Sequence, residues 1–432
     1  MNPERPNPNY LAEKITQETA IKTLADTEEI FYWNKKTGLY EPAEIKLKTQ
    51  IQNEVIYQTT RNYVNEVLDA IRRMTYTNRE EIGENTDDIP LENTIYDFNT
   101  GQTRDYTPND FFLKKHPLKY YSQTPNEKIE PSPIEKFLSE VTGTSEDEVI
   151  LKEIIGYCFY RKMPFHNFFL LVGGGGNGKS VYLNILRKMI GNENVSNESL
   201  QNLVQNRFAP ANLYLKNANI FGDLSGKALS DAGTLKLLTG EDTITAEQKF
   251  KPSFQFKNYA KIIASCNEVP ETPDMSDGFF RRPIIINFPH SFIGKENRNL
   301  ANELCTPENL SDLFHVCISA FKDALKENNL VRSEGIQQKK WSYLAYSNSA
   351  YAFCQETIEY DPECELTTEN IYKKYMNFCK KNTLTPKDER VFFQKLYKYF
   401  GHKAYKRRKS KIVGLKEVRE YVIVGVCWKR EE

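Results

Sequence analysis

A glycine-rich stretch near the middle of the chain holds the residues whose types and spacing most clearly indicate chemistry. The pattern G-x-x-x-x-G-K-S places Gly173, Gly178, Lys179 and Ser180 as in a phosphate-binding loop. Glycines let backbone N–H groups approach phosphate oxygens, the lysine neutralises their charge, and the serine hydroxyl can ligate Mg²⁺. The stretch therefore predicts binding of ATP with Mg²⁺. The predicted contacts are Gly173, Gly174, Gly175, Gly176, Asn177, Gly178, Lys179, Ser180 and Val181.

The segments on either side match the elements that would position such a loop. Residues 168–172 form a continuous apolar run, which is typical of a buried strand, and residues 181–190 carry apolar side chains at roughly helical spacing. A helix that begins at the loop adds the positive end of its dipole to the phosphate site. The alternative is a chance glycine run in a loop, and the flanking pattern argues against it.

Two later apolar runs end in polar side chains that could complete the site. Asp223 ends the run ANIFGD, and a carboxylate there could hold Mg²⁺ and orient the attacking water. Asn267 ends the run AKIIASCN and could contact the γ-phosphate or that water. The structural alternatives are a turn aspartate and a capping amide. Asp223 is thus predicted as a second metal ligand beside Ser180.

Basic side chains stand where they could reach phosphates outside the loop. Arg281 and Arg282 precede a further apolar run, and a guanidinium there could contact a phosphate held by an adjacent subunit. Lys249, Phe250 and Lys251 form the tip of a predicted β-hairpin, where lysines could pair with nucleic-acid phosphates and the ring could pack on a base. The alternatives are surface arginines and a solvated turn.

The C-terminal end combines helical patterns with a basic run. Two helices are followed by a basic run and a strand-like segment at 420–428. Two helices and a two-stranded ribbon together suggest a winged helix. The run includes Lys406, Arg407 and Arg408, which would suit the backbone of duplex or forked DNA. A solvated charged face is the alternative.

Length and composition limit the class of protein. The 432 residues exceed what one core usually supports, so two to four domains are expected, and the zero net charge excludes a uniformly basic nucleic-acid coat. Eight cysteines without a C-x-x-C pair indicate a reducing compartment and no zinc site. No signal region or membrane-length apolar run is visible, so a soluble, cytoplasmic protein is expected.

Taken in order, the motifs GGGGNGKS, IFGDLS, KIIASCN and FFRRPIIINF carry a family resemblance. They resemble those of superfamily 3 helicases, and more closely the helicase part of phage, plasmid and poxvirus-type primase-helicases. The resemblance implies that Lys179 and Ser180 are the Walker A pair, Asp223 the Walker B acid and Asn267 the motif C asparagine. It also implies that one of the two arginines is an arginine finger. Arg282 is favoured because it directly precedes the strand.

One departure from the family affects the metal site. Many relatives carry two adjacent acids in motif B, whereas here Gly222 precedes Asp223 and Leu224 follows it. Asp223 would then have to serve both as metal ligand and as the group that positions water. No acidic pair or zinc-binding set that would indicate a primase is found.

The resemblance also implies an architecture and partners. It implies an α/β fold with an AAA+ P-loop ATPase core built on a parallel sheet, an N-terminal mixed helical domain and a C-terminal winged-helix-like domain. The predicted boundaries are 1–130 for a helicase-associated domain, 131–165 for a helical connector, 166–300 for the core, 301–350 for a helical extension and 351–432 for the winged-helix-like domain. The implied partners are single-stranded and forked DNA, five further copies of the chain in a hexameric ring, and a primase or polymerase, with no membrane.

Three functions remain open at this point. The first is an ATP-dependent DNA helicase of a viral, phage or plasmid replication system. The second is an initiator or loader that binds an origin and uses ATP only to assemble. The third, a small-molecule phosphotransferase, would share the phosphate loop but would not need Asn267, the arginine pair or the basic hairpin.

Overall fold

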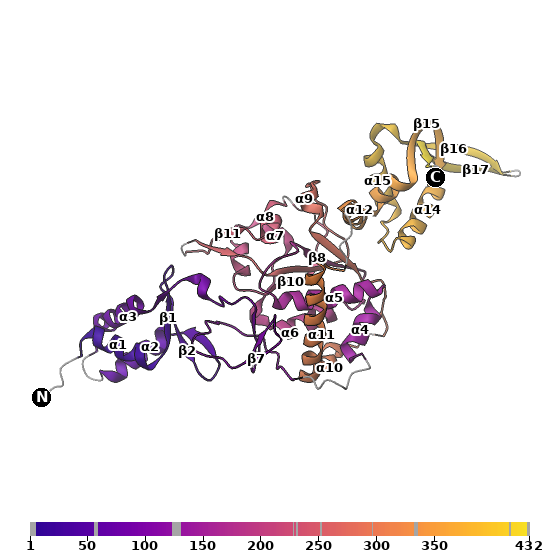
Figure 1. Ribbon diagram of the computed structural model, residues 1–432. Helices are drawn as coiled ribbons and strands as arrows, with labels where there is room; N and C mark the ends of the chain where they lie inside the picture. The colour runs from indigo at the N-terminus through magenta and orange to yellow at the C-terminus, as the bar shows by residue number, and fades with distance from the viewer. Residues whose placement is uncertain are drawn as a thin grey trace.

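A five-stranded parallel sheet forms the centre of the protein (Figure 1). We describe a computed structural model of the chain, in which residues 6–55, 59–122, 131–227, 229, 232–250, 253–295, 297–331, 336–413 and 416–429 are described. The strands lie in the order β14-β8-β13-β10-β9. Their bounds are Phe168–Val172 (β8), Val195–Ser196 (β9), Ala218–Leu224 (β10), Lys261–Cys266 (β13) and Pro283–Asn287 (β14).

Helices cover both faces of this sheet, and the side chains of β8 alternate between them. Phe169 and Leu171 pack in the same core as three helices, whereas Phe168, Leu170 and Val172 pack in a second core on the other face. The helices of the first core are α5 (Ser145–Phe159), α6 (Lys179–Ile190) and α11 (Pro307–Lys326), with α4 (Pro133–Val141) and α10 (Leu300–Leu304) beside them. Those of the second are α7 (Leu200–Gln205), α8 (Gly233–Leu238), α9 (Asp277–Phe280) and α12 (Ile336–Ser347). Burial on both faces explains why β8 reads as an unbroken apolar run.

The N-terminal part combines helices with short strands in two sheets. A four-stranded sheet, β3-β2-β1-β4, stands with three helices, and a three-stranded sheet, β5-β6-β7, follows. The bounds are Pro8–Glu18 (α1), Ile21–Leu24 (β1), Ile30–Asn34 (β2), Leu39–Pro42 (β3), Glu44–Glu54 (α2), Arg61–Thr75 (α3), Tyr76–Thr77 (β4), Asp88–Pro90 (β5), Ile95–Asp97 (β6) and Thr103–Arg104 (β7). The short strands of this part lack the long apolar runs of the core.

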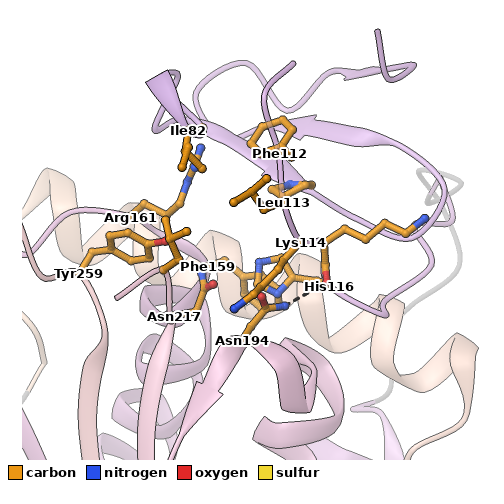
Figure 2. A pocket seen from close by; sticks show the side chains of 14 residues that line it. Ile82, Phe112, Leu113, Lys114, His116, Phe159, Arg161, Asn194, Asn217 and Tyr259 are labelled. Carbon is orange, nitrogen blue, oxygen red and sulfur yellow. Dashed lines mark hydrogen bonds between the residues drawn. The ribbon is translucent and has the colours of Figure 1, made fainter. Parts of the chain in front are cut away.

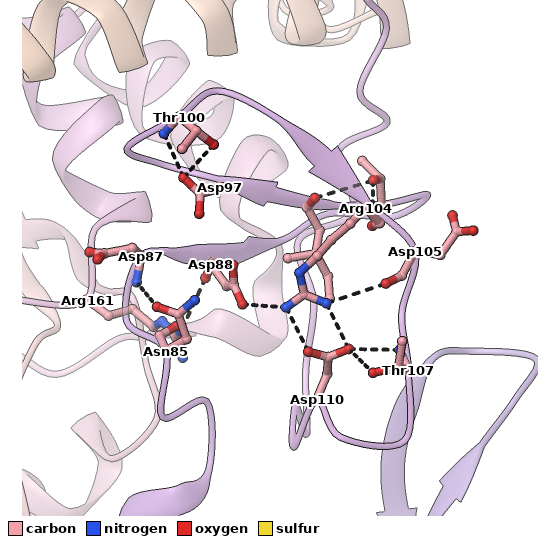
Figure 3. Close-up of polar contacts among 12 residues, drawn as sticks. Asn85, Asp87, Asp88, Asp97, Thr100, Arg104, Asp105, Thr107, Asp110 and Arg161 are labelled. Atoms are coloured by element: carbon pink, nitrogen blue, oxygen red, sulfur yellow. Dashed lines mark hydrogen bonds and ion pairs between the residues drawn. The ribbon is translucent and has the colours of Figure 1, made fainter.

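A polar network fixes the second of these sheets to the core (Figure 3). The guanidinium of Arg104 pairs with Asp88 at 2.6 Å and with Asp110 at 2.7 Å. Arg161, which follows α5, donates to the backbone carbonyls of Asn85 and Asp88. The hydrogen bonds of Arg161 therefore join the N-terminal part to the segment after α5, and the ion pairs of Arg104 hold residues within the N-terminal part together.

A cavity of about 40 Å³ lies along the same junction (Figure 2). Phe112 and His116 reach it from the N-terminal part, and Phe159 and Tyr259 reach it from the core. The ring of His116 makes a hydrogen bond of 2.8 Å with the carbonyl of Ile190, and burial lowers the pKa of His116 to about 4. A neutral buried histidine used in this way has a structural role.

A hairpin and a separate C-terminal region complete the fold. The hairpin pairs β11 (Thr243–Ala246) with β12 (Phe254–Lys257), as predicted. The C-terminal region, defined as residues 349–429, contains a three-stranded sheet and projects from the core beyond α12 (Figure 1). Its elements are α13 (Ser349–Thr357), β15 (Ile358–Thr367), α14 (Thr368–Lys381), α15 (Glu389–Phe400), β16 (Tyr405–Val413) and β17 (Lys416–Trp428).

The C-terminal region agrees in part with its prediction. The two helices and the two-stranded ribbon, β16 paired with β17, are confirmed, and β15 adds a third strand that the sequence did not predict. Cys364 on β15 and Cys427 on β17 form a disulfide, a pairing that the cysteine spacing did not indicate. No described helix has the length and apolar character needed to cross a bilayer.

Candidate active site

The glycine-rich loop connects β8 to α6, as the sequence predicts. Gly176 and Gly178 adopt positive φ angles of 65° and 90°, a region that glycine enters without steric cost. A Cβ atom on Gly178 would lie 2.5 Å from the Cγ1 atom of Val141 on α4, so the position also requires close approach to a neighbouring helix. Gly174 and Gly175 face open space, where a ligand can approach their backbone.

Lys179 begins α6 and holds its ammonium group over the loop. The Nζ atom donates to the carbonyls of Gly173 at 2.6 Å and Gly174 at 2.9 Å, and to the Oδ1 atom of Asn177 at 3.1 Å. Asn177 in turn donates to the carbonyl of Phe288 at 3.2 Å, which fixes the loop to the end of β14. Burial lowers the pKa of Lys179. Phosphate oxygens arriving at the loop could replace these neutral acceptors.

A cavity of about 580 Å³ brings the loop together with two of the other predicted residues. Its lining includes Lys179, Ser180, Asp223 and Asn267. This grouping follows from topology, since β8, β13 and β10 are adjacent and parallel, and their carboxyl ends therefore meet at one edge of the sheet. The arrangement is that of a P-loop-like core with polar groups aimed at the loop.

The end of β10 is irregular where Asp223 stands. The pairing of β10 with β13 shifts register between Phe221 and Leu224, and Ser265 donates its hydroxyl hydrogen to the carbonyl of Gly222. Asp223 is exposed to the cavity, as is Ser180. A carboxylate and a hydroxyl are hard oxygen donors of the kind that Mg²⁺ prefers, so the residues present fit this metal.

Sequence reasoning missed the residues that line the outer part of the cavity. They come from α4, which contributes Phe137 and Glu140, and from a segment after β14 that contributes Phe292 and Lys295. The N–H group of Phe292 donates to the carbonyl of Gly176 at 2.7 Å, which holds this segment over the loop. No motif marks these residues, and only the fold brings them to the site.

The two predicted arginines lie outside the cavity, at the amino end of β14. Arg282 is buried, and its guanidinium donates to the Oγ1 atom of Thr239 at 3.0 Å and to the carbonyl of Gly278. Arg281 is exposed. The preference for Arg282 as the group that reaches another subunit therefore conflicts with its environment, because its donors are already used within its own chain.

The predicted nucleic-acid contacts lie in two places remote from the loop in sequence. Phe250 at the hairpin tip has 96% of its surface exposed, and the Nζ atom of Lys249 lies 5.5 Å from the centre of its ring. Lys251 lies outside the described residues. On β16, Arg407 pairs with Glu365, whereas the Nζ atom of Lys406 lies 4.1 Å from the ring centre of Tyr421.

Two family matches cover parts of the chain. Residues 10–143 match the family described as D5 N terminal like, and residues 171–282 match a family of unknown function, DUF5906. The first match spans most of the N-terminal part. The second begins in β8 and ends at Arg282, so it includes the phosphate loop and the strands that carry Asp223 and Asn267.

Curated relatives come from large DNA viruses. The chain is 23% identical over 295 residues to the putative helicase L207/L206 of Acanthamoeba polyphaga mimivirus, covering 66% of this chain and 30% of that protein. It is 24% identical over 219 residues to the putative helicase 121R of Invertebrate iridescent virus 3, covering 48% of this chain and 23% of that protein. The chain thus spans less than a third of the length of these relatives.

The solved structures that match the chain include the A form apo structure of the NrS-1 C terminal region. It is 14% identical, covers 98% of this chain and 100% of that chain, and has a TM-score of 0.49. A second apo structure of the same region, 305-718, has a TM-score of 0.47 at 14% identity. The match to the D5 N terminal like family and the similarity to two viral putative helicases agree with the resemblance drawn from the ordered motifs.

Proposed function

We propose that the protein is a Mg²⁺-dependent ATPase that unwinds DNA as the helicase part of a viral, phage or plasmid replication system. The observation that carries the proposal is the convergence of Lys179, Ser180, Asp223 and Asn267 in one cavity at the carboxyl edge of the sheet. A phosphotransferase acting on a small molecule would not require Asn267 or the basic hairpin. The names of the viral relatives support the same class.

Each polar group that lines the cavity has a role in this proposal. Lys179 would neutralise the β- and γ-phosphates, while Ser180 and Asp223 would hold Mg²⁺. A metal held there would supply positive charge that offsets the negative charge developing on the phosphate oxygens. Asp223 would also orient the attacking water, and Asn267 would contact the γ-phosphate.

The remaining predicted residues would connect turnover to DNA. We propose an AAA+ type hexameric ring in which the exposed Arg281 of one subunit reaches the phosphate loop of the next, and in which Lys249 and Phe250 grip single-stranded DNA in the central channel. The exposure of all three side chains supports this proposal. An intracellular site of action and a primase or polymerase partner belong to the same proposal.

The two halves of the proposal can be separated by mutation. Lys179→Ala should abolish ATP turnover, because the phosphates lose their main counter-charge. Lys249→Ala should keep basal turnover and lower unwinding of a forked duplex, as measured by strand displacement. Lys257→Ala, which removes an exposed lysine at the base of the hairpin, is the matched control. Normal unwinding by Lys249→Ala would contradict the channel assignment.

An initiator or loader that binds DNA without unwinding it is the second candidate. The exposed basic strand β16 at the end of the projecting C-terminal region favours it. Strand displacement by the purified protein would exclude this alternative. A sequence-specific footprint without displacement would support it.

A further inference from the structure

The loop that follows Asn267, residues 268–271, is held by ion pairs from the C-terminal region. Lys387 pairs with Glu268, and the Nζ atom of Lys395 on α15 lies 2.8 Å from the Oε1 atom of Glu271. All four residues are distant from the phosphate loop in sequence. The C-terminal region therefore contacts the core directly beside a residue of the candidate active site.

Helix α12 holds the same loop through backbone contacts. The hydroxyl of Tyr343 donates to the carbonyl of Pro270 at 2.8 Å, and the N–H group of Val269 donates to the carbonyl of Tyr346 at 3.4 Å. Tyr343 is buried in the core on that face of the sheet. The loop is thus fixed at its middle by the core and at its two glutamates by the C-terminal region.

The loop also contacts the segment that follows Asp223. A Cβ atom placed on Gly226, three residues after Asp223, would lie 3.6 Å from the Cβ and Oε2 atoms of Glu268. The N–H group of Leu229 donates to the carbonyl of Glu271 at 2.8 Å. Glu268, which directly follows Asn267, therefore lies against the segment that follows Asp223.

Partial exposure of the two glutamates limits what the ion pairs add to stability. The side chains of Glu268 and Glu271 are 41% and 45% exposed, and pairs of this kind contribute little to the free energy of unfolding. The position of a catalytic side chain has a larger effect on the reaction, because a shift of about 1 Å in a catalytic group can lower a rate about a hundredfold. An ion pair next to Asn267 can therefore affect the position of Asn267 even though it contributes little to the free energy of unfolding.

We propose that the Glu268–Lys387 ion pair, reinforced by Glu271–Lys395, positions Asn267 and thereby makes ATP turnover depend on the C-terminal region. Glu268 and Lys387 are positioning residues, since neither lines the cavity. The inference rests on the ATP hydrolysis proposed above. A movement of the C-terminal region, such as one caused by DNA bound to β16, would change the position of Asn267 through these contacts.

The test is a charge exchange in the full chain. Glu268→Lys and Lys387→Glu should each lower kcat by about three- to tenfold with KM nearly unchanged, and the double variant should recover most of the loss. Lys398→Glu, an exposed lysine on α15, is the control and should leave kcat unchanged. A merely structural role would lower the melting temperature of both single variants in step with kcat, whereas a positioning role should lower kcat at a nearly unchanged melting temperature.

A second readout separates this inference from the proposed function. Amide hydrogen exchange in α14 and α15 is followed with and without a non-hydrolysable ATP analogue. Analogue-dependent protection is expected in the wild-type protein and the double variant, and not in the single variants. If the wild-type protein binds the analogue but does not turn over ATP, the proposed ATP hydrolysis is refuted. The hydrogen-exchange pattern would still show whether the nucleotide site is coupled to the C-terminal region. Unchanged kcat and protection in both single variants would refute the coupling.

Discussion

Arg281 and Arg282 are adjacent in sequence and differ in environment. Arg282 uses its guanidinium within its own chain, where burial lowers its pKa, whereas Arg281 is exposed. The exposed side chain alone remains available to a phosphate on another molecule. At this position, side-chain burial rather than distance from the strand decides between a structural and a functional arginine.

The two arginines should therefore fail in different ways when replaced. Arg281→Ala should lower ATP turnover by about a thousandfold, the typical effect of losing an arginine finger, with an unchanged melting temperature. Arg282→Ala should lower the free energy of unfolding by about 1–3 kcal/mol, because buried acceptors lose their donor. Steady-state ATPase assays and urea unfolding measure both effects. A stable Arg282→Ala protein without turnover, next to an active Arg281→Ala protein, would reverse the assignment.

A second buried cation lies at the start of β13. The Nζ atom of Lys261 donates to the carbonyls of Tyr160 and Tyr259 and lies 4.5 Å from the ring centre of Tyr157. Burial lowers the pKa of Lys261 from 10.5 to about 7. The unfolded chain therefore holds this proton up to a higher pH than the folded chain does.

The sign of the resulting pH dependence follows from proton counting. Between pH 7 and about 10 the unfolded state binds more protons at this position, so stability should rise with pH, by up to about 1.4 kcal/mol per unit. Lys261→Met should remove this rise, and the exposed control Lys257→Met should not. Urea unfolding of the three proteins at pH 7, 8 and 9 measures the difference. Parallel pH curves for wild type and Lys261→Met would contradict it.

At the scale of elements, strands buried on both faces could be predicted and short or polar ones could not. β8, β13 and β14 read as continuous apolar runs because helices cover both sides of each. β9 has only two residues, and β15 carries the sequence IEYDPECELT, much of it exposed. Neither gives a periodic signal, since their pairing depends on distant partners.

The same distinction applies to the candidate site. Lys179 and Ser180 belong to a local pattern whose geometry is set within a few residues, and Asp223 and Asn267 each end a readable strand. Glu140 and Lys295 reach the cavity from elements with no motif of their own. Local chemistry could thus be predicted from the sequence, whereas the walls of the cavity depend on tertiary packing.

Strand β16 separates the predicted basic contacts onto two faces. Successive side chains of a strand point to opposite sides, so Lys406 and Arg408 share one face and Arg407 lies on the other. Arg407 is already paired with Glu365, whereas Lys406 and Arg408 stand beside the exposed Tyr421. The face with Tyr421 is therefore better suited to nucleic-acid phosphates.

Replacement of each face should show the difference. Lys406→Ala with Arg408→Ala should weaken binding to duplex DNA and reduce the slope of log K against log salt by about two, one unit for each lost phosphate contact. Arg407→Ala should change the slope little. Fluorescence anisotropy titrations at several salt concentrations provide the measurement. Equal slopes for the two variants would show that the strand does not bind DNA through one face.

At the scale of the whole molecule, one chain does not complete the proposed site. The phosphate loop lies at the carboxyl end of β8 and Arg281 precedes the amino end of the neighbouring β14, and the two strands are paired in parallel. Five residues of strand separate these ends by about 16 Å. A finger at the amino edge would therefore act across a boundary between subunits.

Mixing two inactive variants should restore activity if that boundary exists. The Lys179→Ala variant keeps Arg281, and the Arg281→Ala variant keeps the phosphate loop. An interface between one subunit of each variant can therefore combine an intact loop with an intact Arg281. If the two variants assemble at random into a ring with head-to-tail interfaces, about a quarter of the interfaces combine an intact loop with an intact Arg281. ATP turnover of the mixture, with negative-stain images in ATP analogue and single-stranded DNA, measures this. An inactive mixture of assembled rings would mean that the finger and the loop do not meet across the boundary.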